Sequence, residues 1–309
     1  MKKNIASIDL GSNSCRLRIA NEKGEVLYMD SKPTMLGQGL HKTGILSEES
    51  FMRGQKALSE FACLMKKYDV KSYRAITTEA CRSALNGSDF IRMIEKETGI
   101  VLEIIDAKEE ARLNLKGASL NAPKDKEYIA LYDLGGASTE ISLSKNDGKC
   151  QILHTVSIPW GARNAAEAYC LREFSQKQAH RLSTDIKKYV DDFMKKCDFE
   201  KYHDKCCLLA TSSTPLRLCA MVKNDGEYSR DKNDGACVMC FDFDKAIDAV
   251  CHMDLHQRQQ SAYIGEDRAP IFIAAGIIFQ TIYKQLGFNQ MIVSFKGAQD
   301  AIIEELCHG

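Results

Sequence analysis

The sequence predicts an α/β protein made of two related domains, and three observations support this fold class. Short apolar runs typical of strands alternate with longer segments whose apolar residues recur at helical spacing. A strand–loop–strand–turn–strand pattern occurs twice, and its two aspartates, Asp9 and Asp133, stand 124 positions apart. The chain has 309 residues, which corresponds to about two domains of ~150 residues each.

The first copy of the pattern lies at the N-terminus. An apolar strand ends at Ile8-Asp9-Leu10 and runs into the loop 11–14. A second strand, a turn and a third strand are expected at residues 15–20, 21–24 and 25–29.

The second copy begins with a strand at residues 131–134, followed by a glycine loop. Its second strand, turn and third strand are expected at residues 140–144, 145–148 and 150–156. A polar linker, Asn121–Lys126, precedes this copy and is the natural boundary. We therefore expect an N-terminal domain at residues 1–122 and a C-terminal domain at 123–309, with the last helix packing back on the first domain.

Helices are expected between and after these strands. Ser47, Ser88 and Ser175 are suitable N-caps, and each precedes apolar residues at helical spacing. The helix after Ser88 should end at Gly99, where a glycine favours termination. Near the C-terminus we expect a buried helix, a strand and a final helix, at residues 270–286, 291–295 and from 298 onward.

The composition excludes several classes of protein. Hydrophobic residues make up 44% of the chain, and 42 basic side chains balance 42 acidic ones. A disordered chain has less apolar material, and a strongly electrostatic nucleic-acid binder is usually basic. The longest apolar stretch, Ile271–Phe279, is too short for a membrane span, which needs about 18 residues. We expect neither a nucleic-acid nor a membrane partner.

Thirteen cysteines require a choice between disulfides, metal and plain thiols. The count is odd, and the N-terminal residues contain no apolar signal-peptide core. These features favour a cytoplasmic protein with reduced thiols. The Cys237–Cys240 pair leaves zinc as an alternative, although no second pair with ligand spacing accompanies it.

The two glycine loops are candidate phosphate-binding sites. Glycine lets the backbone approach a ligand closely, so consecutive N–H groups can surround phosphate oxygens, and hydroxyl groups can add donors. The candidate residues are Gly11, Ser12, Asn13 and Ser14 in the first loop, and Gly135, Gly136, Ala137, Ser138 and Thr139 in the second. The alternative is a pair of tight hairpins with capping hydroxyls.

An aspartate precedes each loop at the end of a strand. Asp9 and Asp133 are well placed to hold Mg²⁺ directly or through water, because this ion prefers carboxylate oxygens and retains part of its hydration shell. Neither loop is a Walker A sequence, since no Gly-Lys-Ser/Thr follows the glycines.

The order of motifs resembles the family of exopolyphosphatases and guanosine pentaphosphate phosphohydrolases. Both loops resemble that family's phosphate motifs, and so do segments further along the chain, at residues 77–87, 104–113, 157–162 and 267–269. The resemblance implies two actin-like domains, of the ribonuclease H-like superfamily that includes actin and sugar kinases, facing an interdomain cleft. It spans nearly the whole chain in the expected order.

The resemblance also implies roles for individual residues. In the Glu-Glu-Ala-Arg segment, Glu110 corresponds to the base that activates water, with Glu109 as the neighbouring candidate. Arg82 corresponds to the arginine that contacts the terminal phosphoryl group, and its planar fork suits two oxygens. The resemblance further assigns Arg16 to phosphate binding and Glu140, beside Asp133, to the catalytic and metal-binding set, with Mg²⁺ or Mn²⁺ as the cofactor.

Two segments depart from the family pattern, and one of them, residues 294–300, keeps a glycine but lacks the Arg-Glu pair often seen there. Where a Gly-Gly-Thr loop is usual, this chain has Thr211-Ser212-Ser213-Thr214-Pro215. Side chains at Ser212 and Ser213 would narrow the loop, and Pro215 removes a backbone donor. We expect this to alter how the rest of a long chain or a nucleotide is held. The length suits the two-domain catalytic core alone.

These observations predict an exopolyphosphatase that hydrolyses terminal orthophosphate from inorganic polyphosphate. The alternatives are a 5′-phosphohydrolase of guanosine pentaphosphate (pppGpp), a kinase-like phosphotransferase, and a non-catalytic sensor of polyphosphate or nucleotide. The Glu-Glu-Ala-Arg segment argues against a kinase, which usually presents an aspartate as base. The resemblance also implies a possible homodimer.

Overall fold

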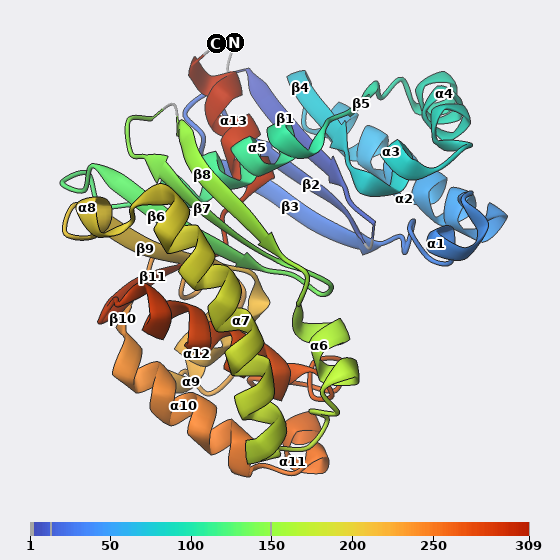
Figure 1. Cartoon of the computed structure of the whole chain (residues 1–309). Helices are drawn as coiled ribbons and strands as arrows, with labels where there is room; N and C mark the ends of the chain where they lie inside the picture. The colour runs from blue at the N-terminus through green and yellow to red at the C-terminus, as the bar shows by residue number, and fades with distance from the viewer. Residues whose placement is uncertain (1–2, 13, 149, 309) are drawn as a thin grey trace. The chain divides into compact units, whose positions relative to one another are not determined.

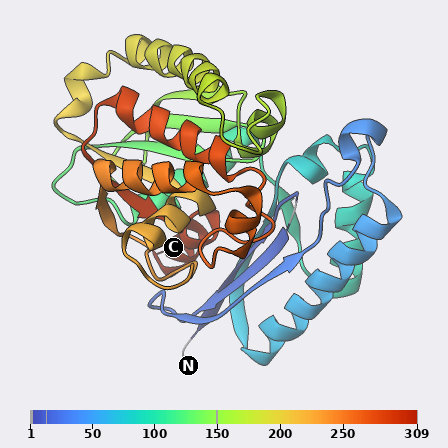
Figure 2. The same cartoon turned by 90° about the horizontal axis from the view of Figure 1, so that it is seen from below.

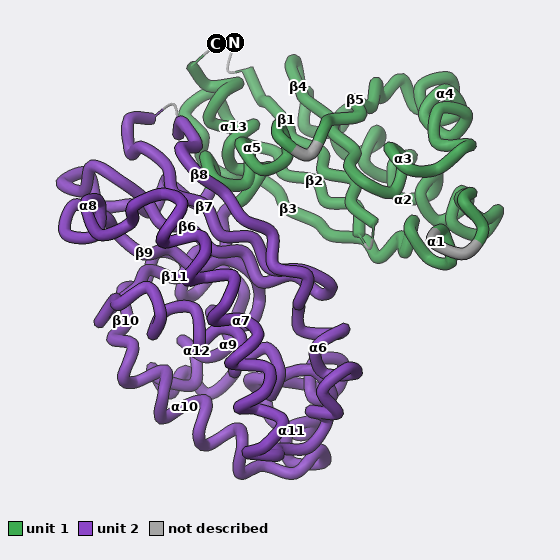
Figure 3. The backbone as a smooth tube through the Cα atoms, viewed as in Figure 1, with its two compact units in different colours: residues 1–117, 297–309 green, residues 118–296 purple. Residues whose placement is uncertain are grey.

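The computed structural model describes residues 3–12, 14–148 and 150–308 (Figure 1). The chain divides into two compact units (Figure 3). Unit 1 comprises residues 1–117 and 297–309, and unit 2 comprises residues 118–296. The last helix of the chain is therefore part of unit 1.

Unit 1 contains a five-stranded sheet in the order β3-β2-β1-β4-β5. The strands are β1 (Asn4–Leu10), β2 (Ser14–Ala20), β3 (Val26–Pro33), β4 (Val70–Thr77) and β5 (Leu102–Ile104). Strand β2 is antiparallel to both β1 and β3, whereas β4 lies parallel to both β1 and β5. The carboxyl ends of β1, β4 and β5 therefore meet at one edge of the sheet.

Helices cover both faces of this sheet. They are α1 (Leu40–Thr43), α2 (Glu48–Lys67), α3 (Glu79–Ser83), α4 (Gly87–Thr98), α5 (Ala107–Ser119) and α13 (Ala298–His308). In α2, the Ser47 hydroxyl accepts a hydrogen bond from Ser50 N, and Leu58 and Phe61 are fully buried. Figure 2 shows α2, in blue, running along the sheet of unit 1. On the other face, Ile302 of α13 packs in a separate apolar cluster with Ile76 of β4.

Unit 2 contains a six-stranded sheet in the order β10-β11-β9-β6-β7-β8. The strands are β6 (Tyr128–Leu134), β7 (Thr139–Lys145), β8 (Ile152–Ile158), β9 (Cys206–Thr211), β10 (Cys237–Met239) and β11 (Gln290–Ser294). Strands β6, β9 and β11 run parallel, while β7, β8 and β10 are antiparallel to their neighbours. The carboxyl ends of β6, β9 and β11 again share one edge.

The helices of unit 2 surround a larger core. They are α6 (Ala162–Ala168), α7 (Gln176–Cys197), α8 (Glu200–His203), α9 (Ser213–Val222), α10 (Cys240–His252), α11 (Leu255–Gln260) and α12 (Phe272–Leu286). Helix α12 is apolar on nearly every side, and it is buried among α6, α7, α9 and α10. Its observed start at Phe272 lies two residues after the expected one.

The two units repeat the same hairpin, as the sequence predicts. In unit 1, Leu10 pairs with Cys15 and the Gly11 N–H donates to the Ser14 carbonyl at 3.0 Å. In unit 2, Leu134 pairs with Thr139, and Gly135 N–H donates to the carbonyl of the residue three positions on, also at 3.0 Å. Each first strand also lies parallel to a strand that leads into a helix, β4 in unit 1 and β9 in unit 2. The predicted α/β architecture of two related units is confirmed.

Several expected boundaries are wrong by a few residues, among them the end of β3 at Pro33 rather than at Met29 and the start of β6 at Tyr128 rather than at Leu131. The third strand of the second copy begins at Ile152 rather than at Cys150. Helix α4 begins at Gly87 with Asn86 as its N-cap, so Ser88 lies inside the first turn. The Asn86 side chain is engaged elsewhere, because it exchanges two hydrogen bonds with the backbone of Leu46.

Candidate active site

The first glycine loop closes the β1–β2 hairpin in unit 1. A second segment supports it, since the Gly37 N–H donates to the Ser12 carbonyl at 2.9 Å. A Cβ atom at Gly37 would lie 3.1 Å from the Ser12 Cβ, so the two segments touch closely. Asn13, a predicted phosphate ligand, lies outside the described residues. Gly11 and Ser14 form the turn itself.

Asp9 and Arg16 face each other across this hairpin. They are directly paired in the β1–β2 register, and Asp9 Oδ2 lies 3.7 Å from Arg16 Nη1. The Arg16 Nε atom is buried and has no acceptor among the described residues. A phosphate oxygen would satisfy such a donor. Arg18, two residues further on, instead forms a buried ion pair with Asp300 of α13.

Arg82 and Glu110 come together at the edge of the same sheet. Arg82 lies on α3, directly after β4, and Glu110 lies in the first turn of α5, directly after β5. The Arg82 Nη1 atom lies 3.5 Å from Glu110 Oε2 and donates to the Ile105 carbonyl at 2.6 Å. The chain turns from α3 into α4 at Gly87. Only glycine fits at this position, because a Cβ there would lie 2.1 Å from the Cys81 carbonyl oxygen.

The pKa of Glu110 departs upward from its ordinary value of 4.5. Burial raises this pKa, the Arg82 guanidinium opposes the rise, and the Asp9 carboxylate adds to it. Asp9, which precedes the first loop, is thus among the charges that act on Glu110. A half-buried carboxylate with a raised pKa suits proton transfer near neutral pH better than an ordinary surface glutamate does.

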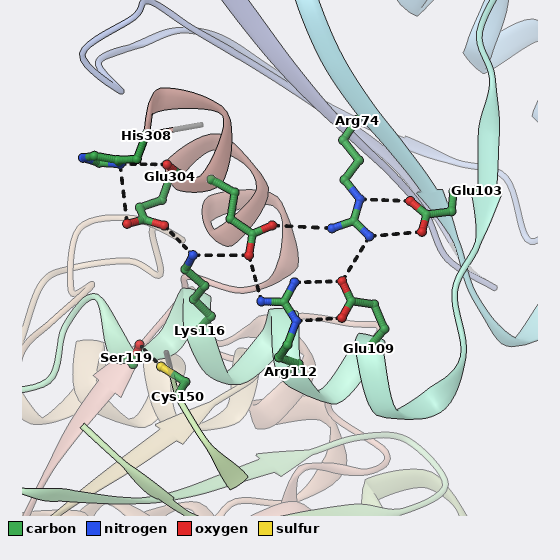
Figure 4. Close-up of polar contacts among 10 residues, drawn as sticks. Arg74, Glu103, Glu109, Arg112, Lys116, Ser119, Cys150, Glu304 and His308 are labelled. Atoms are coloured by element: carbon green, nitrogen blue, oxygen red, sulfur yellow. Dashed lines mark hydrogen bonds and ion pairs between the residues drawn. The ribbon is translucent and has the colours of Figure 1, made fainter. Parts of the chain in front are cut away.

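Glu109, the neighbouring candidate, lies in a different environment (Figure 4). Its carboxylate accepts two hydrogen bonds from Arg112 and one from Arg74. Hydrogen bonds from Arg112 and Arg74 lower its pKa to about 2 against the effect of burial, with Arg112 contributing most. Arg74 and Arg112 also pair with Glu305 of α13. Glu109 therefore joins α5 to β4 and to the network around α13, and its oxygens are engaged by arginines.

The second glycine loop is held by the start of α6. The carbonyl of Gly135 accepts from Ala162 N at 2.9 Å, and that of Gly136 accepts from Arg163 N at 2.8 Å. The Asn164 side chain donates to the Ala137 carbonyl at 2.7 Å. Helix α6 therefore binds the carbonyl side of the loop.

The N–H side of this loop is available to a ligand. Within the described part of the chain, no acceptor is found for the N–H groups of Gly136, Ala137 and Ser138. Three consecutive donors, in a loop whose Gly135, Gly136 and Ala137 carbonyls are bound by residues of α6, form the kind of concavity that binds anions. Thr139 is different, because its hydroxyl donates to the Trp160 carbonyl and its side chain is buried.

An acidic pair lies beside the second loop. Asp133 and Glu140 are directly opposite in the β6–β7 register, so their side chains lie on the same face. Glu140 is exposed and accepts hydrogen bonds from the hydroxyls of Ser138 and Ser157. Like charges in opposed positions destabilise a sheet unless a cation lies nearby.

The turn after β9 adopts a strained backbone. Ser212 has φ 92° and ψ 177°, a conformation that glycine adopts far more readily, at a cost of about 1–3 kcal/mol for other residues. Its hydroxyl oxygen is buried and has no partner among the described residues. Pro215 is the third residue of α9, where an N–H would lack a helical acceptor in any case, so the proline removes no bond from the helix.

Sequence analysis missed two residues that contact the candidate residues, one in each unit. Asn164 holds the second loop, and the signal for it is the Gly161-x-x-Asn164 spacing, in which the asparagine side chain also accepts from Gly161 N–H. Glu79 binds the Arg82 guanidinium, and three-residue spacing on a helix is the signal for that pair.

Among the residues that the structure describes, no group of three or more His, Cys, Asp or Glu side chains is arranged to hold a metal ion. The thirteen cysteines form no disulfide, and none of the described helices is long and apolar enough to cross a membrane.

The fold and these residues define a two-unit α/β protein that carries an Asp-x-Gly hairpin in each unit and a glutamate–arginine site in unit 1. Its family follows from comparison with known proteins. The model of the Ppx/GppA phosphatase family matches residues 18–308, and the chain belongs to this family.

Several curated proteins are similar to parts of the chain. A bifunctional 3-dehydroquinate synthase/phosphatase of Fusobacterium nucleatum is 29% identical over 221 residues, which cover 68% of this chain and 33% of that protein. Exopolyphosphatase 2 of Mycobacterium tuberculosis is 32% identical over 155 residues, which cover 46% of this chain and 49% of that protein. The chain thus spans between about a third and a half of the length of these relatives.

Solved structures share the fold over the whole chain. The Aquifex aeolicus member of the Ppx/GppA family matches with a TM-score of 0.85 and 23% identity, covering 100% of this chain and 99% of that one. An exopolyphosphatase from Cytophaga hutchinsonii matches with a TM-score of 0.78 and 21% identity, covering 99% and 98%. The resemblance to this family noted in the sequence is confirmed.

Proposed function

We propose that this protein is a phosphoanhydride hydrolase that removes terminal orthophosphate from inorganic polyphosphate. The observation that carries the proposal is the position of Glu110, a half-buried carboxylate with a raised pKa whose Oε2 lies 3.5 Å from the Arg82 guanidinium. Phosphoryl transfer to water needs a group that orients and deprotonates the water and a cation that neutralises the phosphate.

In this proposal Glu110 accepts the proton of the attacking water. Its neighbour Glu109 is unsuited to that task because two arginines bind its oxygens and lower its pKa to about 2. Arg82 binds oxygens of the terminal phosphoryl group, and its fixed charge stabilises the negative charge that spreads over them in the transition state.

The two glycine loops hold phosphate groups in this proposal. The N–H groups of Gly136, Ala137 and Ser138 donate to phosphate oxygens. In unit 1 the donor is Arg16 Nε, which has no acceptor within the described part of the chain. Asp9, Asp133 and Glu140 offer only oxygen ligands, which fit a hard divalent cation such as Mg²⁺ or Mn²⁺. Such an ion needs only one or two protein carboxylates when phosphates and waters complete its shell. When bound, it would neutralise charge on the phosphates.

A second substrate is favoured by one relative. A guanosine-5′-triphosphate,3′-diphosphate pyrophosphatase of Photobacterium profundum is 34% identical over 144 residues, covering 45% of this chain and 29% of that protein. Hydrolysis of pppGpp breaks the same type of phosphoanhydride bond, so the residues named above would serve either substrate. A cytoplasmic location would give access to both.

A substrate panel tests the proposal. Orthophosphate release is measured with polyphosphate, pppGpp and ATP, each with Mg²⁺ and with a chelator. The proposal predicts Mg²⁺-dependent release from polyphosphate at a higher kcat/KM than from the other two. Faster release from pppGpp would favour the second substrate, and release from none of the three would overturn both.

A further inference from the structure

Arg82 already has an anionic partner on its own helix. Glu79 Oε2 accepts hydrogen bonds from both Nε and Nη2 of Arg82, at 3.1 and 2.5 Å. The other terminal nitrogen, Nη1, faces the Ile105 carbonyl and Glu110. The Nε–Nη2 edge, which is one of the two edges with which a guanidinium can bind a phosphate bidentately, is therefore occupied by a carboxylate.

This contact can be displaced easily. The Glu79 side chain is 62% exposed, against 27% for Arg82, and the two residues are three positions apart on a short helix. Exposed ion pairs of this kind contribute little free energy, since solvent screens them and two long side chains must be held in one geometry. The phosphate end of a substrate carries more negative charge than one carboxylate and can replace it.

From this contact we infer that Glu79 competes with substrate phosphate for Arg82 and thereby sets the affinity of the site. The inference rests on the proposed function for the role of Arg82. A phosphate oxygen binds the Nε–Nη2 edge only after the Glu79 side chain rotates toward solvent. While it stays nearby, its charge also repels the incoming anion. Glu79 is then a specificity-determining residue that weakens binding of phosphate ends.

The substitution Glu79→Gln removes the carboxylate that competes with phosphate and keeps the size of the side chain. In Glu79→Gln the amide retains the length of the side chain but lacks the charge. A matched control is Asp89→Asn. Asp89 also lies in the first turn of a unit 1 helix and forms an exposed ion pair three residues on, with Arg92. Both variants remove one negative charge from the same unit.

The experiment titrates inorganic phosphate into the full chain by calorimetry and measures KM and kcat with polyphosphate. Glu79→Gln should bind phosphate about threefold to tenfold more tightly and lower KM by a similar factor, with a smaller change in kcat. Asp89→Asn should match the wild type. A merely structural role for Glu79 would not tighten phosphate binding.

Three results would overturn the inference: unchanged or weaker phosphate binding by Glu79→Gln, equal tightening in Asp89→Asn, or no phosphate binding by either the wild type or Glu79→Gln. The proposed function is judged separately by polyphosphate turnover of the wild type. Tighter phosphate binding by Glu79→Gln without any wild-type turnover would support the competition and reject the hydrolase.

Discussion

The hairpins of the two units share a backbone but differ in charge. In both, the aspartate of the first strand stands directly opposite a charged residue of the second strand. In unit 1 that residue is Arg16, and the Asp9–Arg16 pair is neutral. In unit 2 it is Glu140, and the Asp133–Glu140 pair carries two negative charges. The same geometry therefore presents a cationic side chain in one unit and a carboxylate pair in the other.

This difference in charge suggests that the hairpins of the two units have different roles in binding. A neutral pair whose buried Arg16 Nε has no partner among the described residues favours direct binding of a phosphate oxygen. A pair of opposed carboxylates favours a divalent cation, which then binds phosphate in turn. The two loops are also supported differently: Gly37 contacts the first, while the N-terminus of α6 holds the second.

The largest expected effect separates two adjacent glutamates. Glu110→Gln should lower kcat by about 100-fold or more, because general-base catalysis contributes roughly 10²–10⁴. Glu109→Gln should reduce kcat much less, since Glu109 acts through its ion pairs with Arg112 and Arg74. Orthophosphate release under saturating polyphosphate measures both. Equal losses in the two variants would reject the assignment of the base.

The next largest effect tests whether the unit 2 hairpin binds a cation while the unit 1 hairpin binds phosphate. Glu140→Gln should raise the Mg²⁺ concentration needed for half-maximal activity by about tenfold, since it removes one of two carboxylates beside the cation. Arg16→Gln should raise KM for polyphosphate and leave the Mg²⁺ requirement unchanged. Mg²⁺ titrations of activity compare the two. If Arg16→Gln raised the Mg²⁺ requirement and Glu140→Gln raised only KM, the proposed roles of the two hairpins would be wrong.

A smaller effect concerns the support of the second loop. Asn164→Ala removes the bond to the Ala137 carbonyl and the cap on Gly161 N–H. The N–H groups should then be less well ordered, and KM should rise about threefold to tenfold. The matched variant is Gln178→Ala, near the start of α7, whose side chain accepts a hydrogen bond from Arg181. An unchanged KM in Asn164→Ala would mean that the second glycine loop keeps its conformation without the Asn164 side chain.

The pH dependence of activity follows from Glu110. A base must be ionised to accept a proton, and the pKa of Glu110 lies above its ordinary value of 4.5. Activity should therefore fall as pH decreases through a midpoint above 4.5. In Arg82→Gln the midpoint should move to higher pH, because the guanidinium lowers this pKa. Rate profiles of kcat/KM for both proteins supply the test, and a midpoint that moves downward would contradict it.

The smallest effect is on stability. The pKa of Glu109 is lowered from 4.5 to about 2, so its ion pairs stabilise the folded state above pH 4.5, and this contribution is lost as pH falls toward 2. Glu109→Gln should lower the free energy of unfolding by about 1 kcal/mol at pH 7. The difference from the wild type should shrink between pH 4.5 and 2. Denaturant unfolding at several pH values provides the measurement.

The fold could be predicted because short sequence motifs specify its hairpins and because the same motif occurs in both units. The glycine loops and the Asp9-to-Asp133 spacing specify hairpins, and a repeated hairpin before a parallel strand specifies related units. Sequence motifs also predicted Arg82 and Glu110. Their approach could not be derived from spacing alone, since it depends on β4 and β5 ending at the same edge of the sheet.

Other features depend on tertiary contacts that local patterns do not specify. The choice between Glu109 and Glu110 rests on which side chain faces Arg112 and Arg74 and which faces Arg82. The positive φ of Ser212 is imposed by the passage from β9 into α9, and nothing in a Thr-Ser-Ser-Thr run predicts it.

The most direct test of the account follows isotope in the product. Tripolyphosphate is hydrolysed in ¹⁸O-labelled water by the wild type and by Glu110→Gln, and the label is located by mass spectrometry. The account predicts one solvent oxygen in the released orthophosphate, formed rapidly by the wild type and at about a hundredth of that rate or less by the variant. Label in the remaining diphosphate, or equal release by the variant, would contradict attack of a Glu110-activated water on the terminal phosphoryl group.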